Sequence, residues 1–210
     1  MSVAIVFGCP GSGKTVNTTL VPGKNLLISS DNSSVVLRNF KRDSLEVKSV
    51  ATFKDFLDAF DAATEGKKYD TIIADCLTDI IDGFIVECRE NKAFPDIRQA
   101  YVLAYTKVKN LVRKAAHCDT DVIFTCWEDA DEFTSPTGEI KTRLSPMLPA
   151  KIKQQVCGLC NVIAYVTAIT DKNGDKRWVY VTEPRDTMMV KDQLGCRKVC
   201  KPEDIFNVGS

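Results

Sequence analysis

The residues with the clearest chemistry lie near the start of the chain, directly after an apolar run at positions 3–7. They fit the pattern GxxxxGK[ST] and read Gly8, Cys9, Pro10, Gly11, Ser12, Gly13, Lys14 and Thr15, followed by Val16. Glycines in such a turn let successive backbone N–H groups point inward around a phosphate. Lys14 can add a positive charge for the β and γ phosphates, and the Thr15 hydroxyl can bind Mg²⁺. The sequence therefore predicts a phosphate-binding loop.

Two carboxylates follow the apolar runs 25–30 and 69–75, which we predict to be buried strands. The carboxyl ends of parallel strands meet at one edge of a sheet, where ligands bind. Asp75 is therefore expected to hold, through water, the Mg²⁺ that Thr15 also binds. Asp31 is expected near the γ-phosphate, where it would polarise the attacking water. Because Asp is also a common turn residue at a strand exit, a purely local role for Asp31 stays open.

A third apolar run, at 121–127, ends in polar residues that are also candidates for the site. Thr125 could sense the γ-phosphate, and Glu128 is a second candidate to orient the attacking water. Glu128 also begins the acidic run 128–132. Composition favours a solvated loop for that run.

The elements that would position these residues alternate between strand and helix patterns. Strands are expected at 3–7, 25–30, 45–50, 69–75 and 121–127, and helices at 16–20, 53–63, 80–88 and 100–116. The runs 161–170 and 176–182 flank Asp171-Lys172-Asn173-Gly174, which is typical of a hairpin turn. We therefore expect one α/β domain over residues 1–210, with a mostly parallel central sheet, helices on its faces and an antiparallel hairpin at one end.

Composition limits the classes of function. The chain has 210 residues, 44% of them hydrophobic, which is enough for a substantial core. Lysines and arginines balance aspartates and glutamates at 28 each, so no overall positive charge points to nucleic acid. No basic leader precedes an apolar segment, and no apolar run approaches the ~18 residues of a membrane span. We expect a cytoplasmic protein without a membrane partner.

The segment from Ser135 to Pro149 is rich in Pro, Gly, Ser and Thr, and we predict it to be a mobile loop. Its basic residues, with those that begin the next helix, would form a stripe that could contact a single-stranded nucleic acid backbone. The stripe comprises Lys141, Arg143, Lys151 and Lys153. Composition slightly favours the alternative, a solvated charged face.

Several segments together resemble a known family. The phosphate loop at the N-terminus, the strand exit at Asp31, and the segments YDTIIADCLTDI (69–80), DVIFTCWED (121–129) and SPMLPAKI (145–152) occur in this order. The arrangement resembles small phage-encoded RecA-like ATPases with an AAA-type nucleotide-binding domain. That resemblance implies hydrolysis of ATP with Mg²⁺, a role in DNA recombination or single-strand annealing, a homo-oligomeric ring or filament, and a location in the host cytoplasm.

The segment MVKDQLG at 189–195 is similar to the KNRFG segment of bacterial RadA. By that resemblance Lys191 would reach the γ-phosphate bound by a neighbouring subunit. Gln193 and Leu194 replace the Arg and Phe of the motif, so Arg197 is the nearby candidate for a second positive contact.

The cysteines raise an alternative, because Cys157, Cys160, Cys196 and Cys200 form two close pairs that could build a zinc site. Type II thymidine kinases resemble this arrangement, with an N-terminal phosphate loop and a cysteine zinc element. Asp75 is followed by Cys76 and not by the Glu that serves those kinases as a base. Ordinary buried thiols are the favoured interpretation. A third possibility is a nucleotide-switched assembly protein with little turnover.

Overall fold

The apolar runs of the sequence form the middle of a long, mostly parallel β-sheet, because β-branched and aromatic side chains suit a backbone that is buried on both faces. The computed structural model describes residues 1–31, 33–40, 42–90, 96–135, 137–170 and 172–207. The strands are β1 (Val3–Gly8), β2 (Asn25–Ser29), β3 (Leu45–Ser49), β4 (Thr71–Asp75), β5 (Asp121–Thr134), β6 (Ile140–Pro146), β7 (Val162–Thr170), β8 (Lys176–Val181), β9 (Lys191–Asp192) and β10 (Val199–Cys200).

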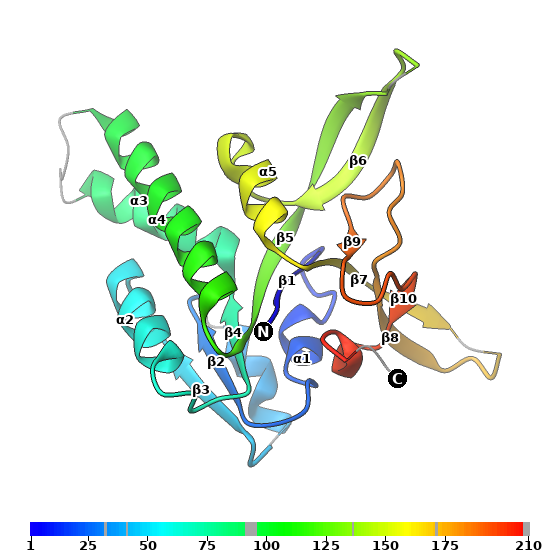
Figure 1. The fold of residues 1–210 in the computed structure, drawn as a ribbon, viewed down its shortest axis with the longest axis horizontal. Helices are drawn as coiled ribbons and strands as arrows, with labels where there is room; N and C mark the ends of the chain where they lie inside the picture. The colour runs from blue at the N-terminus through cyan, green and yellow to red at the C-terminus, as the bar shows by residue number, and fades with distance from the viewer. Residues whose placement is uncertain (32, 41, 91–95, 136, 171, 208–210) are drawn as a thin grey trace.

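The strand order is β10-β8-β7-β1-β5-β4-β2-β3, and the strands from β7 to β3 run parallel (Figure 1). β1 lies between β5 and β7, and β4 lies between β5 and β2. The carboxyl ends of β1, β4, β5 and β2 therefore share one edge of the sheet. This edge carries the phosphate loop and Asp75.

The helices are α1 (Lys14–Thr18), α2 (Phe53–Thr64), α3 (Leu77–Glu90), α4 (Ile97–His117) and α5 (Ala150–Leu159), with the 3₁₀ helices η1 (Ser33–Asn39) and η2 (Pro202–Asp204). Side chains cap two of them: Thr52 Oγ1 accepts a hydrogen bond from Asp55 N at 3.1 Å, and an Asp96 carboxylate oxygen accepts one from Arg98 N at 2.9 Å. Such caps satisfy backbone N–H groups that have no partner within the helix.

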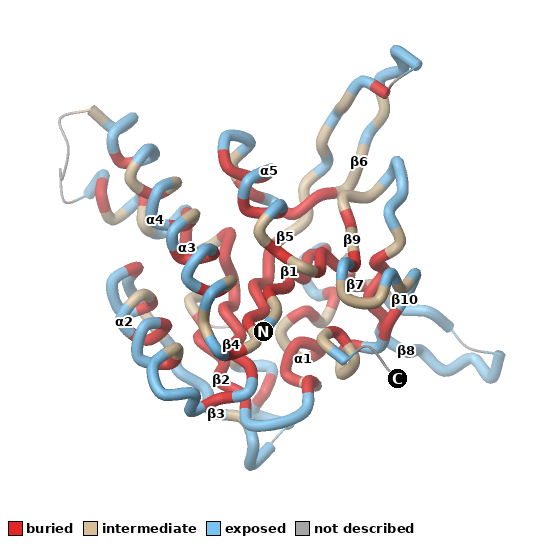
Figure 2. Tube along the Cα trace, in the orientation of Figure 1, coloured by how far each residue is buried: buried red, intermediate tan, exposed pale blue. Residues whose placement is uncertain are grey.

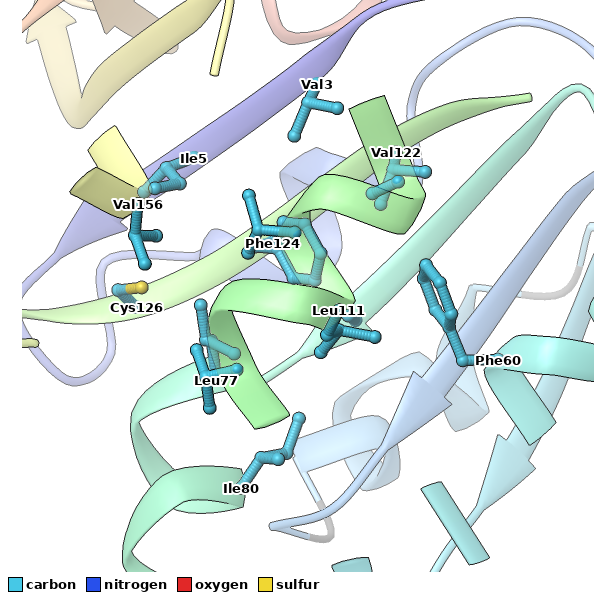
Figure 3. Packing of buried hydrophobic residues seen from close by; sticks show 14 of the residues in the cluster. Val3, Ile5, Phe60, Leu77, Ile80, Leu111, Val122, Phe124, Cys126 and Val156 are labelled. Atoms are coloured by element: carbon cyan, nitrogen blue, oxygen red, sulfur yellow. The ribbon is translucent and has the colours of Figure 1, made fainter. Parts of the chain in front are cut away.

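Alternation along the strands divides the core into two layers. Val3, Ile5 and Phe7 of β1 face α2, α3, α4 and α5, while Ala4 and Val6 face the side of the sheet with Tyr180 and Ile205. The larger layer holds Phe60, Leu77, Leu111, Phe124 and Val156, among others (Figure 3). Figure 2 shows the buried sheet between the more exposed outer faces of the helices.

Beyond the core, β5 continues past Trp127 and pairs antiparallel with β6, from Glu128 opposite Pro146 to Thr134 opposite Ile140. The two strands extend from the body as an arm (Figure 1). This corrects two expectations: the acidic run 128–132 is strand and not a solvated loop, and the central part of the predicted mobile loop is β6. The cause is tertiary, because cross-strand pairing satisfies the backbone of both polar segments. Position 136 lies outside the described residues.

The predicted hairpin after residue 160 is confirmed, since β7 pairs antiparallel with β8. Its expected turn residue Asp171 lies outside the described part of the chain. The mostly parallel sheet flanked by helices, with antiparallel strands toward the C-terminus, is also confirmed. Among the helices of the described residues, none is both long and apolar enough to cross a membrane.

Candidate nucleotide-binding site

A pocket of about 290 Å³ opens at the carboxyl edge of the sheet. Its lining includes Gly13, Lys14, Thr15, Asp31, Asp75 and Trp127. Parallel strand ends provide this place, because each connecting segment leaves the sheet at the same edge. The structure therefore brings the loop, the predicted metal ligand Asp75 and one of the two candidate water-orienting residues into one cavity.

The loop has the backbone that its glycines were expected to allow. Gly11 and Gly13 have φ values of 78° and 77°, in the left-handed region. At Gly8 an added Cβ would lie 2.7 Å from Val166 Cγ1 and 2.9 Å from Ser12 Oγ, so a side chain there would force these neighbours to shift. Lys14 Nζ donates to the carbonyl oxygens of Gly8 and Cys9 at 2.8 and 2.9 Å, which places its charge over the loop.

Asp75 is the centre of a hydroxyl cluster beneath the loop. Its Oδ2 accepts hydrogen bonds from Thr15 Oγ1 at 2.7 Å and from Ser33 Oγ at 2.5 Å, and its Oδ1 accepts one from Thr125 Oγ1. Burial raises the pKa of the Asp75 carboxyl, and the three hydroxyl donors partly offset that effect. A carboxylate and hydroxyls are oxygen donors of the kind that Mg²⁺ prefers, so these residues fit the ion.

Asp31 follows β2 and lines the pocket. One of its carboxylate oxygens also accepts a hydrogen bond from Ser33 N at 3.0 Å, which is the local turn contact considered as its alternative role. The two interpretations are compatible, because a turn held by Asp31 also presents its carboxylate to the cavity. Its negative charge contributes to the raised pKa of Asp75.

Glu128 lies at the base of the arm, one residue after Trp127, and is not among the residues that line the pocket. Its carboxylate lies close enough to Tyr165 of β7 to affect the pKa of that phenol. Burial and the Glu128 carboxylate raise the pKa of Tyr165 to about 12. Among the described residues, the Glu128 Oε2 atom is buried and has no hydrogen-bond partner. Because Trp127 is in register with Gly8, Glu128 lies beside the loop, with its carboxylate near Tyr165.

Lys191 is in β9, where it pairs with Ile163 of β7. Ile163 is in register with Ile5, three residues before the loop, so Lys191 lies away from the pocket of its own chain. The Arg197 guanidinium is used within the chain: Nε donates to Asp192 Oδ2 at 2.6 Å, and its other nitrogens donate to carbonyl oxygens of residues 204, 205 and 207. Arg197 therefore holds the C-terminal segment in place within its own chain. This corrects the expectation that it supplies a second positive contact to the γ-phosphate of a neighbouring subunit.

The cysteines do not assemble as the zinc alternative requires. Cys157 and Cys160 are buried at the end of α5, Cys200 is buried in β10, and Cys196 is exposed. Burial raises the pKa of the Cys157 thiol to about 11 and that of Cys160 further. Within the residues that the structure describes, no three His, Cys, Asp or Glu side chains are placed to hold a metal ion. For Cys157, Cys160 and Cys200 the arrangement agrees with buried, protonated thiols, whereas Cys196 is a surface thiol.

Four residues that line the pocket were not predicted as site residues: Cys76, Trp127, Ser33 and Val36. The last two reach the pocket from η1. Neither belongs to a motif. Their only sequence signal is position, because they follow the carboxyl end of a strand that neighbours β4.

Comparison with known proteins agrees with this geometry. A family model described as an AAA domain matches residues 2–194. The chain belongs to this AAA domain family. Its fold is similar to that of a KaiC-like protein from the hyperthermophilic archaeon Pyrococcus horikoshii, with a TM-score of 0.50 and 11% identity over 95% of this chain and 88% of the other. No curated protein matches. The AAA domain protein thus has the RecA-like fold of P-loop proteins, and its family supports nucleotide binding.

Proposed function

We propose that this AAA domain protein is a Mg²⁺-dependent ATPase, with residues 1–210 forming one nucleotide-binding domain. The observation that carries the proposal is the 2.7 Å hydrogen bond from Thr15 Oγ1 to Asp75 Oδ2. It joins the hydroxyl of the phosphate loop to the carboxylate of a neighbouring strand. These are the two protein groups that a Mg²⁺ ion shared with the β and γ phosphates requires.

In this proposal the loop residues from Gly8 to Val16 bind the triphosphate. The loop N–H groups and Lys14 stabilise the charge on the transferring phosphoryl group, and Thr15 and Asp75 would hold Mg²⁺. When bound, the ion neutralises charge on the phosphate oxygens. Asp31, in the pocket, or Glu128, beside the loop, orients the attacking water. Lys191 would act on the γ-phosphate of a neighbouring copy, which agrees with its distance from its own pocket and requires a homo-oligomer.

The partner that we propose is single-stranded DNA, in recombination or replication. This part rests on the sequence resemblance to phage-encoded annealing ATPases. The expected basic stripe is interrupted, because Lys153 of α5 is buried and pairs with Asp129 and Asp131 of the arm. Lys141 of the arm pairs with Glu139 and Asp186.

Phosphate release from MgATP by the purified full chain tests the proposal, with Lys14→Ala and Asp75→Asn as the test variants. We expect each variant to lose turnover by roughly 100-fold or more, since each removes a group that stabilises phosphoryl charge. Lys48→Ala, an exposed change on β3, is the matched control and should retain activity. Wild-type turnover in Lys14→Ala would overturn the proposal, as would a phosphorylated nucleoside as the product. Nucleotide-dependent assembly without hydrolysis would favour the switch protein instead.

A further inference from the structure

The neighbouring helices α4 and α5 contain no Asp or Glu. The chain as a whole has equal numbers of acidic and basic residues, so this imbalance is local. The cations of the two helices are Arg98, Lys107, Lys109, Arg113, Lys114, Lys151 and Lys153. Such a concentration of one sign on adjacent elements makes a positive field, which attracts a polyanion.

Three of these cations are used by the fold. Lys153 pairs with carboxylates of the arm, Lys114 Nζ lies 2.6 Å from Asp61 Oδ1, and Arg98 Nε lies 3.0 Å from Asp96 Oδ2. Within the described residues, the other four form no ion pair. Those four are Lys107, Lys109, Arg113 and Lys151. Their charge is therefore available to a partner.

Two of the four line a groove. Lys109 and Arg113 of α4 face Gln155, Gly158 and Leu159 of α5 across a surface hollow of about 310 Å³. One helical turn separates the two cations, about 6 Å along the axis.

The exposed rim of α5 continues this surface. Lys151 is four residues before Gln155 and shares its exposed face. At the far end, Lys191 Nζ lies 3.4 Å from the Gly158 carbonyl oxygen. In Figure 1 the two helices lie side by side, and Figure 2 shows exposed residues along both. Cations therefore lie within the groove and near both ends of α5.

We propose that this groove between α4 and α5 binds the phosphate backbone of a single-stranded nucleic acid. Cations in a line fit a chain of regularly spaced charges, and Gln155 can donate hydrogen bonds to phosphate oxygens. The groove offers no aromatic platform, so binding is expected to be independent of sequence. This inference rests on the proposed function for the identity of the partner, and it moves the contact from the arm to the helices.

The groove lies near the amino ends of the strands, because α4 leads into β5 and α5 leads into β7. The phosphate loop is at the carboxyl end of β1. A nucleic acid strand bound in the groove therefore leaves the nucleotide pocket open. The strands of the arm, by contrast, carry Asp129, Asp131 and Glu132 together with Lys141 and Arg143, so they have no comparable excess of positive charge.

The test is binding of a fluorescent 20-nucleotide oligo-dT to the full chain at several salt concentrations. The variant is Lys109→Gln/Arg113→Gln, and the matched control is Lys48→Gln/Lys54→Gln, which removes two exposed charges on β3 and α2. Loss of two phosphate contacts lowers the slope of log affinity against log salt by about 1.4 and weakens binding about 25-fold at 0.1 M salt. The control should bind as wild type does. MgATP hydrolysis without DNA should be unchanged in both variants.

Equal affinity and salt slope in the groove variant and the control would overturn the inference. It would also be overturned by equally strong displacement of the oligonucleotide by polyglutamate, which would indicate an acidic protein partner. A groove variant that loses self-association by sedimentation, with no loss of oligo-dT binding, would indicate an interface between copies and would likewise overturn it. Since basal hydrolysis is measured separately with Lys14→Ala, failure of the ATPase proposal is distinguishable from failure of the groove.

Discussion

Replacement of Lys153 tests the structure directly. The sequence around Lys153 predicts a solvated basic face, whereas in the structure its side chain is buried. The side chain is 8% exposed. Its Nζ donates to Asp131 Oδ1 at 2.8 Å, Ser145 Oγ at 2.9 Å and Asp129 Oδ2 at 3.2 Å. It thereby joins α5 to both strands of the arm. Lys153→Met keeps most of the side-chain volume and removes all three hydrogen bonds.

The size of the effect follows from the exposure of the partners. Breaking a fully buried ion pair costs about 3–5 kcal/mol, and an exposed pair is worth about 0–1 kcal/mol. The Asp129 and Asp131 side chains are 44% and 26% exposed, so both can be partly hydrated when the ammonium is lost. We expect Lys153→Met to lower the free energy of unfolding by about 2 kcal/mol. In a chain of this length that corresponds to a fall in Tm of roughly 4–8 °C.

Urea and thermal unfolding followed by circular dichroism would measure this difference. Lys151→Met is the matched control, because it makes the same change two residues earlier at an exposed position of the same helix. It should change stability by no more than about 0.5 kcal/mol. If the two variants unfold alike, Lys153 is solvated and the described contact between the arm and α5 is refuted.

Two further predictions follow from the titration of buried groups. Burial alone would raise the pKa of Asp131, but the hydrogen bond from Lys153 holds it below its usual range. The stabilisation that Asp131 gives is therefore present above about pH 4 and is lost as the pH falls through its lowered pKa in the folded state. In urea titrations, the difference in unfolding free energy between wild type and Lys153→Met should be constant from pH 7 to 5 and smaller at pH 3.5. A difference that grows as the pH falls would contradict this. Burial also raises the pKa of Cys157 to about 11, leaving roughly one thiol in a thousand ionised at pH 8, so iodoacetamide should label the exposed Cys9 and Cys196 first, as read by mass spectrometry. MgATP should slow labelling of Cys9 and not of Cys196, and equal labelling of Cys9 with and without nucleotide would argue against the loop as the binding site.

The site could be predicted from sequence where its chemistry is local. The phosphate loop depends on consecutive backbone groups and on glycines that permit left-handed φ values, so its residues are adjacent in the chain. Asp75 was identifiable because a five-residue buried strand ends at it. The hydroxyl of Ser33 was not, because it reaches Asp75 across 42 positions of sequence and belongs to no motif.

The sequence by itself determined the α/β pattern, the loop and the strand that carries Asp75, since periodicity and turn chemistry act within a few residues. Only the tertiary structure decided how the charges are used. From the sequence, Lys153 and Arg197 are expected at a basic surface. In the structure each donates hydrogen bonds to carboxylate or carbonyl oxygens of another segment and so stabilises the fold. Lys109 and Arg113 find none in the described chain and remain at the surface. The physical reason is that burial of a charge depends on which partners the packed elements bring within hydrogen-bond distance, and sequence spacing does not specify those partners.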